Sequence, residues 1–407
     1  MEGCAPGEIF TATYLVNEGH TLDVACLVSE PSGLFSQSYG IYATGYNASP
    51  ESPHFGANYW NRWEREAVVS LYSEDGGFSE PCGVRIFGGF SRSFGQKSLS
   101  ILFRDKYGAA ELNYQLFGED GLDSYEAFVF RSTGQDVYRA HMRDALMTTM
   151  YEDLLDETTC QDARPVVLYI NGEYWGIYFI REKINEHFIA GNYNVDADTV
   201  SILFQKGYGH ADFQSLVTYA RTHDLSQQEH FDYVASRINL QSYTNYLIAQ
   251  MYSSNFDIGN VRYFSSPQYD DGRWNWILYD VDWTMSFQNT DTVRTMLSNN
   301  VVYSADLILA LLENDEFRDW FLTEFARQLN EVWTEENVNA YVDEFVAQLQ
   351  PEMQRECSRW GWRYSTWESE VEYIRTFAKN RPGNMYNYIK AWFGLSDAQM
   401  RAYGFQK

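Results

Sequence analysis

The sequence predicts an α+β fold of two lobes, a β-rich N-terminal lobe followed by a mainly helical C-terminal lobe. Up to residue 185, short runs of β-branched and aromatic residues alternate with Gly, Pro, Ser and Asn, which is typical of strands and turns. From Ser304 almost to the end, apolar residues recur at helical spacing. One hairpin pattern, at residues 261–279, is embedded in the helical half. A chain of 407 residues is long enough for two lobes with a substantial core.

We expect three consecutive segments. Residues 1–75 form a β-rich segment packed on the first lobe, residues 76–185 form that lobe, and residues 186–407 form the helical lobe with the 255–283 hairpin. A glycan-binding face is an alternative for the first segment, because it carries Trp60 and Trp63.

Charge and cysteine content argue against several classes of function. With 30 Lys and Arg against 56 Asp and Glu, the formal net charge is −26, so repulsion from phosphates opposes general nucleic-acid binding. A basic protein substrate is compatible with this charge. The five cysteines show no CxxC pattern and no histidines at finger spacing, which argues against a zinc ribbon or redox motif. A single bridge between Cys4 and Cys26 stays open.

The sequence has no signal for membrane insertion or export. No apolar run approaches the roughly 18 residues that a membrane span needs. The first residues, MEGCAPGEIFTATY, lack the basic and apolar regions of a signal peptide. We therefore expect either a cytoplasmic protein or a chain that begins after a removed signal or an upstream domain.

A glycine-rich turn between two strand patterns is a candidate phosphate cradle. The turn is GGFSRSFG at 88–95, and Lys97 opens the strand pattern that follows. Glycines let backbone N–H groups approach phosphates, Ser91 and Arg92 could add donors, and Lys97 would add a point charge. The alternative is an ordinary hairpin, since neither a Walker A nor a Rossmann fingerprint is present.

Three further local signals order the chain after this turn. A helix is predicted over 139–155, with Asp136 as a possible N-terminal cap and Asp144 among the residues that could face a site. The Asn171-Gly172 pair predicts a type I′ hairpin. Pro382-Gly383 is expected to interrupt the helical pattern before the last long helix.

The most informative stretch runs from Asn255 to Trp283. Asp257 and Asn260 precede the 261–279 hairpin, and Asp280 and Asp282 follow it. Because a hairpin brings its outer ends together, three carboxylates and a carboxamide should gather at one rim. Such oxygen ligands suit Mg²⁺ and bound phosphates.

The order of these features is that of a protein-kinase-like fold. Phosphoryl transfer needs a carboxylate for the acceptor hydroxyl and oxygen ligands for Mg²⁺ at the nucleotide phosphates. In kinases a catalytic Asp, an Asn, a hairpin and a metal-binding Asp follow one another, as Asp257, Asn260, 261–279 and Asp280 do here. The glycine-rich turn, a strand Lys, a helix and a hinge-like hairpin precede them. An HRD motif is absent, and Asp-Val-Asp stands in place of Asp-Phe-Gly.

Three motifs together resemble the CotH family of atypical spore-coat and secreted protein kinases. They are GVRIFGGFSRSFGQKSLSILF at 83–103, NGEYWGIYFIREKI at 171–184 and the 255–283 block, and the likeness extends over roughly residues 30–395. The resemblance implies phosphorylation of Ser/Thr hydroxyls on a protein with ATP and Mg²⁺, or Mn²⁺, and an extracellular, cell-surface or spore-associated location.

The resemblance also implies roles for single residues. It matches Asp257 to the catalytic-loop Asp, Asn260 to the nearby Asn, Asp280 to the metal-binding Asp, and Lys97 to the Lys of the KS strand. Glu182 falls where a hinge would touch adenine. Asp282 is either a second metal ligand or the cap of the next turn.

Two alternative functions stay open. The usual Asp-Trp-Pro of the family is Asp-Ile-Gly at 257–259, so an inactive surface or coat scaffold, with or without glycan binding, is one alternative. The other is a nucleotide-sugar transferase that uses Asp-x-Asp to hold its metal, although such an enzyme is expected to have a doubly wound α/β domain.

Overall fold

A computed structural model describes residues 11–74, 76–119, 121–204, 210–298 and 305–406. The chain divides into two compact units that do not follow the predicted sequential boundaries. Unit 1 comprises Met1–Gly134, Arg164–Arg181 and Gln348–Trp362, and unit 2 comprises Gln135–Ala163, Glu182–Ala347 and Arg363–Lys407. The predicted first lobe, 76–185, thus gives residues 135–163 to unit 2, while 348–362 from the helical half joins unit 1.

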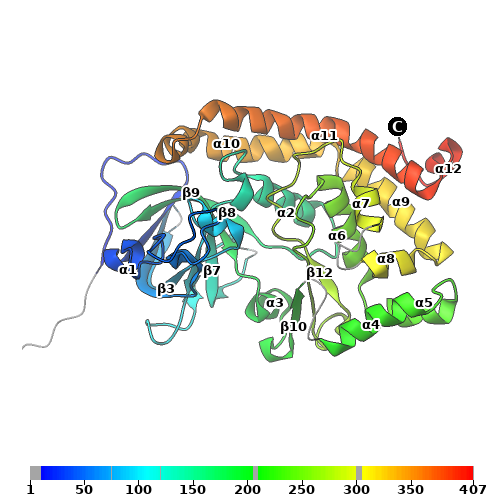
Figure 1. Cartoon of the computed structure of the whole chain (residues 1–407), viewed down its shortest axis with the longest axis horizontal. Helices are drawn as coiled ribbons and strands as arrows, with labels where there is room; N and C mark the ends of the chain where they lie inside the picture. The colour runs from blue at the N-terminus through cyan, green and yellow to red at the C-terminus, as the bar shows by residue number, and fades with distance from the viewer. Residues whose placement is uncertain (1–10, 75, 120, 205–209, 299–304, 407) are drawn as a thin grey trace, which may run out of the picture. The chain divides into compact units, whose positions relative to one another are not determined.

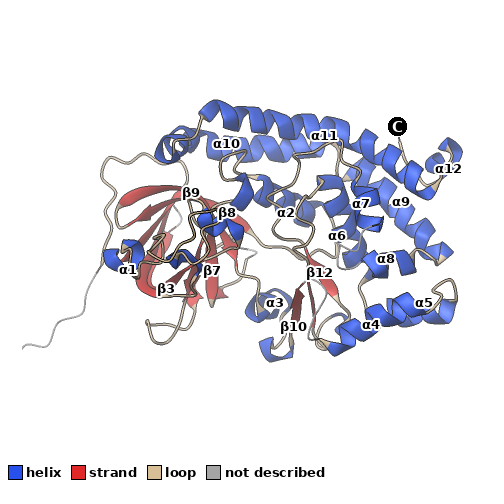
Figure 2. Ribbon diagram, viewed as in Figure 1, coloured by secondary structure: helices blue, strands red, loops and turns tan. Residues whose placement is uncertain are grey.

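Unit 1 is the β-rich part of the α+β fold, as the sequence predicts (Figures 1 and 2). Among its described residues seven strands close into a barrel in the order β1-β2-β3-β4-β7-β9-β8. All neighbouring strands for which a register is defined are antiparallel except β1 and β8, which are parallel. Its strands and helix are β1 (Asp23–Ser29), α1 (Pro31–Phe35), β2 (Arg65–Ser73), β3 (Gly76–Ile86), β4 (Leu99–Leu102), β5 (Leu112–Asn113), β6 (Ser124–Tyr125), β7 (Ala127–Arg131), β8 (Ala163–Ile170) and β9 (Glu173–Glu182).

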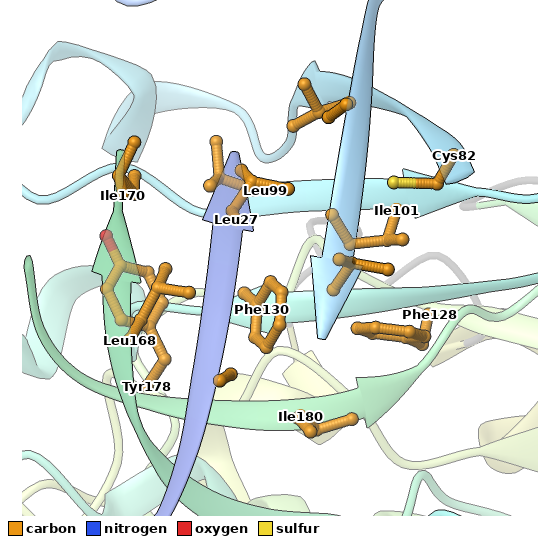
Figure 3. Close-up of a cluster of buried hydrophobic side chains, with 14 of the residues drawn as sticks. Leu27, Cys82, Leu99, Ile101, Phe128, Phe130, Leu168, Ile170, Tyr178 and Ile180 are labelled. Carbon is orange, nitrogen blue, oxygen red and sulfur yellow. The ribbon is translucent and has the colours of Figure 1, made fainter. Parts of the chain in front are cut away.

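The inward-facing side chains of these strands form the core of unit 1 (Figure 3). The register aligns Val84 with Ile101 and Ile101 with Phe128, so three neighbouring strands contribute one buried row. All three side chains are fully buried. Burying each apolar side chain of this size contributes about 1.5–3 kcal/mol, so the alternating pattern is enough to fix which face turns inward.

The predicted type I′ hairpin is confirmed between β8 and β9. Asn171 has φ 51° and Gly172 has φ 80°, the left-handed values that such a turn needs. The Asn171 side-chain oxygen also accepts a hydrogen bond of 2.9 Å from the Ser29 amide at the end of β1. The turn therefore helps to hold β1 beside β8, a pairing of segments about 140 residues apart in sequence.

Residues 348–362 belong to unit 1 because a buried carboxyl on them binds strand β9. Glu356 is fully buried and accepts a 2.7 Å hydrogen bond from the Ile177 amide. The Trp360 ring packs edge-on against Trp175 at 6.0 Å. Gly176 lies between these contacts with φ 120°, and a Cβ there would lie 2.4 Å from Glu356 Oε2. This close approach requires glycine.

Unit 2 is mainly helical and carries one small antiparallel sheet, β10-β11-β12 (Figures 1 and 2). The predicted 261–279 hairpin is confirmed as β11 and β12, whereas the third strand, β10, was not predicted. The strands are β10 (Ser201–Phe204), β11 (Arg262–Ser265) and β12 (Asn275–Ile277), and the helices are α2 (Arg143–Leu154), α3 (Glu186–Tyr193), α4 (Ala211–Thr222), α5 (Gln228–Ala235), α6 (Leu240–Ser253), α7 (Thr292–Ser298), α8 (Ala305–Leu311), α9 (Asp315–Glu331), α10 (Glu335–Trp360, continuing into unit 1), α11 (Tyr364–Phe393) and α12 (Asp397–Ala402).

The expected interruption at Pro382-Gly383 is wrong, because α11 continues through both residues. A proline inside a helix costs about 3 kcal/mol, since it removes a hydrogen bond and crowds the preceding turn. The neighbouring Arg381 is fully buried and donates to the carbonyls of Met251 and Tyr252 at 2.6 and 2.8 Å. This tertiary contact holds the helix in place across the proline.

Two expectations about the chain as a whole can be compared with the described residues. None of the helices described is long and apolar enough to cross a membrane. Cys26, Cys82, Cys160 and Cys357 are buried and form no disulfide with one another, whereas Cys4 lies outside the described residues, so the Cys4–Cys26 bridge stays a prediction.

Candidate active site

Helix α6 leads directly into the loop that carries Asp257. The helix ends at Ser253, and Ser254 adopts a left-handed conformation with φ 54°. The Asn255 side-chain nitrogen then donates 2.8 Å to Gln250 Oε1, and its oxygen accepts 2.9 Å from the Asp257 amide. Asn255 therefore fixes the backbone of Asp257. The sequence contains the signal for this role, an Asn two residues before the bonded amide, but we did not predict it.

The structure brings Asp257, Asn260 and Asp280 together in unit 2. One carboxamide nitrogen of Asn260 donates 2.9 Å to Asp257 Oδ2 and 2.7 Å to Asp280 Oδ2. The Asn260 amide also closes a turn onto the Asp257 carbonyl at 3.3 Å. The hairpin of β11 and β12 thus brings together two of the three carboxylates of the predicted acidic rim and its carboxamide.

The two carboxylates disfavour each other's charge. Partial burial and then the charge of Asp280 raise the pKa of Asp257, while the Asn260 hydrogen bond acts in the opposite direction. A cation at this rim would relieve that repulsion. The Asp280 carboxylate oxygens are ligands that Mg²⁺ prefers, and a half-turn of the Asn260 carboxamide would present its oxygen beside them. These residues therefore fit a divalent metal.

Asp282 accepts a hydrogen bond from outside this group of residues. Its side chain is buried, and Oδ2 accepts a 3.2 Å hydrogen bond from the Gln135 amide. No group of three or more His, Cys, Asp or Glu side chains in the described part of the chain is arranged to hold a metal ion. A second oxygen ligand beside Asp280 would come from Asn260 after that half-turn, and the metal-ligand roles of Asn260 and Asp282 stay predictions.

In unit 1 the glycine-rich turn is held by its own basic side chains. Lys97 is 5% exposed, and its Nζ donates 2.7 Å to the Arg92 carbonyl and 2.6 Å to the Phe94 carbonyl. Burial lowers the pKa of Lys97 to about 8. Arg92 donates through Nε to the Gly88 carbonyl and through Nη1 to the Tyr59 carbonyl. These contacts stabilise the turn itself, and phosphate binding by Lys97 and Arg92 stays a prediction.

Ser91 lies at the start of the same turn. Gly88 has φ 98°, and a Cβ on it would lie 2.8 Å from Ser91 Oγ. The left-handed backbone therefore favours glycine at this position, and the Ser91 hydroxyl would have to rotate to make room for a Cβ. The role of Ser91 as a phosphate donor stays a prediction.

Glu182, at the end of β9, is buried and hydrogen-bonded within unit 2. Its carboxylate accepts 3.2 Å from the Asp162 amide and 3.0 Å from Asn192 Nδ2. Burial, and then the nearby Asp162, raise the pKa of Glu182 to about 8. These contacts stabilise the fold around the Glu182 carboxyl group. Contact of Glu182 with adenine stays a prediction.

The comparison with known protein families identifies this combination of motifs. No curated protein matches the sequence. The family described as CotH kinase protein matches residues 84–385, which cover the glycine-rich turn, helix α2, the β8–β9 hairpin and the Asp257–Asp280 rim. Because the match extends over most of the chain, the chain belongs to the CotH kinase family.

Proposed function

We propose that the chain is a CotH-like atypical protein kinase that transfers the γ-phosphate of ATP to Ser/Thr hydroxyls of a protein substrate. One observation carries the proposal. The Asn260 carboxamide bridges the Asp257 and Asp280 carboxylates at 2.9 and 2.7 Å, in the chain order that phosphoryl transfer uses. Neither packing nor solubility explains two mutually repelling carboxylates held on one side-chain amide.

The residues of the rim have separate roles in this proposal. Asp280 and the Asn260 oxygen would hold Mg²⁺, or Mn²⁺, which when bound neutralises charge on the transferred phosphate. Asp257 would accept a hydrogen bond from the acceptor hydroxyl and orient it for in-line attack. Its raised pKa makes Asp257 a better proton acceptor than an ordinary surface aspartate. Asn255 keeps the Asp257 backbone in place through its 2.9 Å bond.

The Asp-Ile-Gly departure from the family pattern is compatible with this geometry. Ile258 is buried, and the backbone of the loop closes through the 3.3 Å bond from the Asn260 amide to the Asp257 carbonyl. Glycine at 259 therefore does not prevent the turn that presents Asp257 and Asn260 on the same side. This supports an active kinase over an inactive scaffold.

A nucleotide-sugar transferase receives less support. The described strands form a barrel, in which the defined pairings other than β1–β8 are antiparallel, and a small antiparallel sheet; no doubly wound sheet is found among them. The Asp-x-Asp motif would need such a domain beside it. The acceptor protein and an extracellular, cell-surface or spore-associated location rest on family membership alone.

Incubation with γ-labelled ATP, Mn²⁺ or Mg²⁺ and a mixed basic and acidic protein substrate tests the proposal. We expect transfer by the wild type, loss of transfer but retained nucleotide binding in Asp257→Ala, and loss of metal-dependent nucleotide binding in Asp280→Ala. Asp271→Asn, at the exposed far turn of the same hairpin, is the matched control and should stay active. If the wild type neither labels a protein nor is stabilised by nucleotide, the inactive scaffold is the correct description.

A further inference from the structure

The loop that carries Asp280 has an unusual backbone. Asp280 has φ 56°, which is a left-handed conformation that residues other than glycine seldom adopt. The next residue, Val281, is fully buried. The direction of the Asp280 carboxylate toward Asn260 depends on this conformation, so the contacts that hold the loop decide where the carboxylate lies.

Two carboxylates tie this loop to the segment that begins helix α2, and both belong to unit 2. The Val281 amide donates 2.9 Å to Asp144 Oδ1, and the Gln135 amide donates 3.2 Å to Asp282 Oδ2. Each segment thus provides one carboxylate and one backbone amide to the other. The side chains of Asp144 and Asp282 are both buried, where hydrogen bonds to a charged acceptor are stronger than in water.

The segment on the other side of these bonds is firmly held. Asp136 is fully buried, and its carboxylate accepts from the Ala140, Met142 and Arg143 amides at 3.1, 2.9 and 3.0 Å. It also pairs with the Arg143 guanidinium, which donates 2.7 Å to Glu370 on α11. Helix α2 begins at Arg143 with Met142 as its N-cap, so the predicted start at residue 139 and the predicted Asp136 cap are wrong. Asp136 instead binds the backbone amides of Met142 and Arg143 and anchors the neighbouring residue Gln135. The loop at 280–282 is fastened to a rigid element.

We propose that Asp144 and Asp282 are positioning residues that hold the Asp280 carboxylate in its metal-binding orientation. The inference rests on the proposed function and assigns Asp282 a use that differs from direct metal ligation. Asp282 fixes the loop two residues after Asp280 through the Gln135 amide, and Asp144 fixes the amide that directly follows Asp280. Residues that orient a metal ligand typically change metal affinity about 10–100-fold when they are removed.

The affinity of the whole chain for Mn²⁺ tests this without requiring catalysis. Titration followed by Mn²⁺ electron paramagnetic resonance in the presence of ATP gives a half-saturation concentration for each variant. We expect Asp282→Ala and Asp144→Ala to raise it by about 10-fold or more. Asp282→Asn and Asp144→Asn keep an acceptor oxygen for the same amides and should stay within about 3-fold of the wild type. Asp271→Asn, with its exposed side chain, should leave it unchanged.

The outcomes separate the possible roles of Asp282. Rescue by asparagine supports positioning, and so does an Asp144→Ala/Asp282→Ala double variant whose effect is smaller than the product of the single effects. If Asp282→Asn is as impaired as Asp282→Ala, Asp282 is a metal ligand and the inference is wrong. If both alanine variants unfold at lower temperature but bind Mn²⁺ like the wild type, the contacts are only structural. If the buried Asp144→Ala variant does not fold, the comparison of Asp282→Ala with Asp282→Asn still tests whether Asp282 positions the loop. A wild type that binds no Mn²⁺ overturns the proposed function together with this inference.

Discussion

The ionisation of Glu356 should determine much of the pH dependence of stability in unit 1. Its side chain is fully buried on α10, and Oε2 accepts the Ile177 amide at 2.7 Å. Glu356 Oε1 and Gln96 Oε1 are buried acceptors without a hydrogen-bond partner among the described residues. A protonated carboxyl supplies a donor in this place, whereas a carboxylate adds a buried charge that the Ile177 amide, Gln96 and Arg359 offset only in part.

The size of this effect on the free energy of unfolding follows from the shifted pKa of Glu356. Burial raises the pKa of Glu356 from its ordinary value of 4.5 to about 8. Between these two values the folded protein keeps a proton that the unfolded chain has lost, so stability falls as pH rises. At 1.36 kcal/mol per pH unit, the loss between pH 5 and pH 8 is on the order of 4 kcal/mol. Below pH 4.5 the stabilisation of the folded protein by protonated Glu356 is fully present.

Urea denaturation of wild type and Glu356→Gln, followed by tryptophan fluorescence at pH 5, 6, 7 and 8, tests this reasoning. Glutamine cannot ionise and still accepts from the Ile177 amide, so it imitates the protonated acid. The two proteins should be similarly stable at pH 5, and the variant should be more stable by several kcal/mol at pH 8. Glu344→Gln, an exposed residue of the same helix, is the control and should follow the wild type within about 0.5 kcal/mol.

If the difference in free energy of unfolding between Glu356→Gln and wild type does not change with pH, the reasoning about Glu356 is wrong. Glu182 in unit 2 also has its pKa raised to about 8 and should lower wild-type stability over the same range. For this reason the comparison is made between the variant and the wild type at each pH. The part of the pH dependence of the free energy of unfolding that is lost in Glu356→Gln comes from Glu356 alone.

Two further predictions concern the site and the core. Asp257→Asn should abolish transfer and make the metal-free protein slightly more stable than wild type at pH 8 but not at pH 4, because the raised pKa of Asp257 makes its ionisation unfavourable to folding. Since Asp257 is exposed on one side, the gain should be below about 1 kcal/mol in thermal unfolding, and a loss of stability at pH 8 would contradict the repulsion between Asp257 and Asp280. Gly176→Ala should destabilise the protein by about 3 kcal/mol in urea, because its Cβ would lie 2.4 Å from Glu356 Oε2 at φ 120°. Gly172→Ala has φ 80° but open space around the Cβ, so it should cost only about 1 kcal/mol; equal losses would show that the close approach is unimportant.

Much of the site could be predicted because its signals are local. The order Asp257, Asn260, hairpin, Asp280 brings these side chains together once the hairpin forms, since the ends of β11 and β12 must meet. Alternation of buried residues likewise indicates the strands of unit 1.

The direction of the basic side chains was not predictable in the same way. Lys97 stands where a phosphate ligand is expected, yet its ammonium group is buried against the carbonyls of Arg92 and Phe94. A lysine near a strand end has the same sequence whether it points to solvent or inward. The folding of the glycine-rich turn over it decides between these directions.

The sequence by itself determined the two-part α+β fold, the hairpins at Asn171-Gly172 and 261–279, and the identity of the acidic residues, because these depend on periodicity and turn chemistry within a few residues. Only the tertiary structure decided that β1 lies beside β8, that residues 348–362 pack in unit 1, and that Asp282 binds the Gln135 amide. Those contacts join a side chain or strand edge to backbone groups over 140 residues away. Every non-proline residue offers the same amide and carbonyl, so no sequence pattern marks the partner.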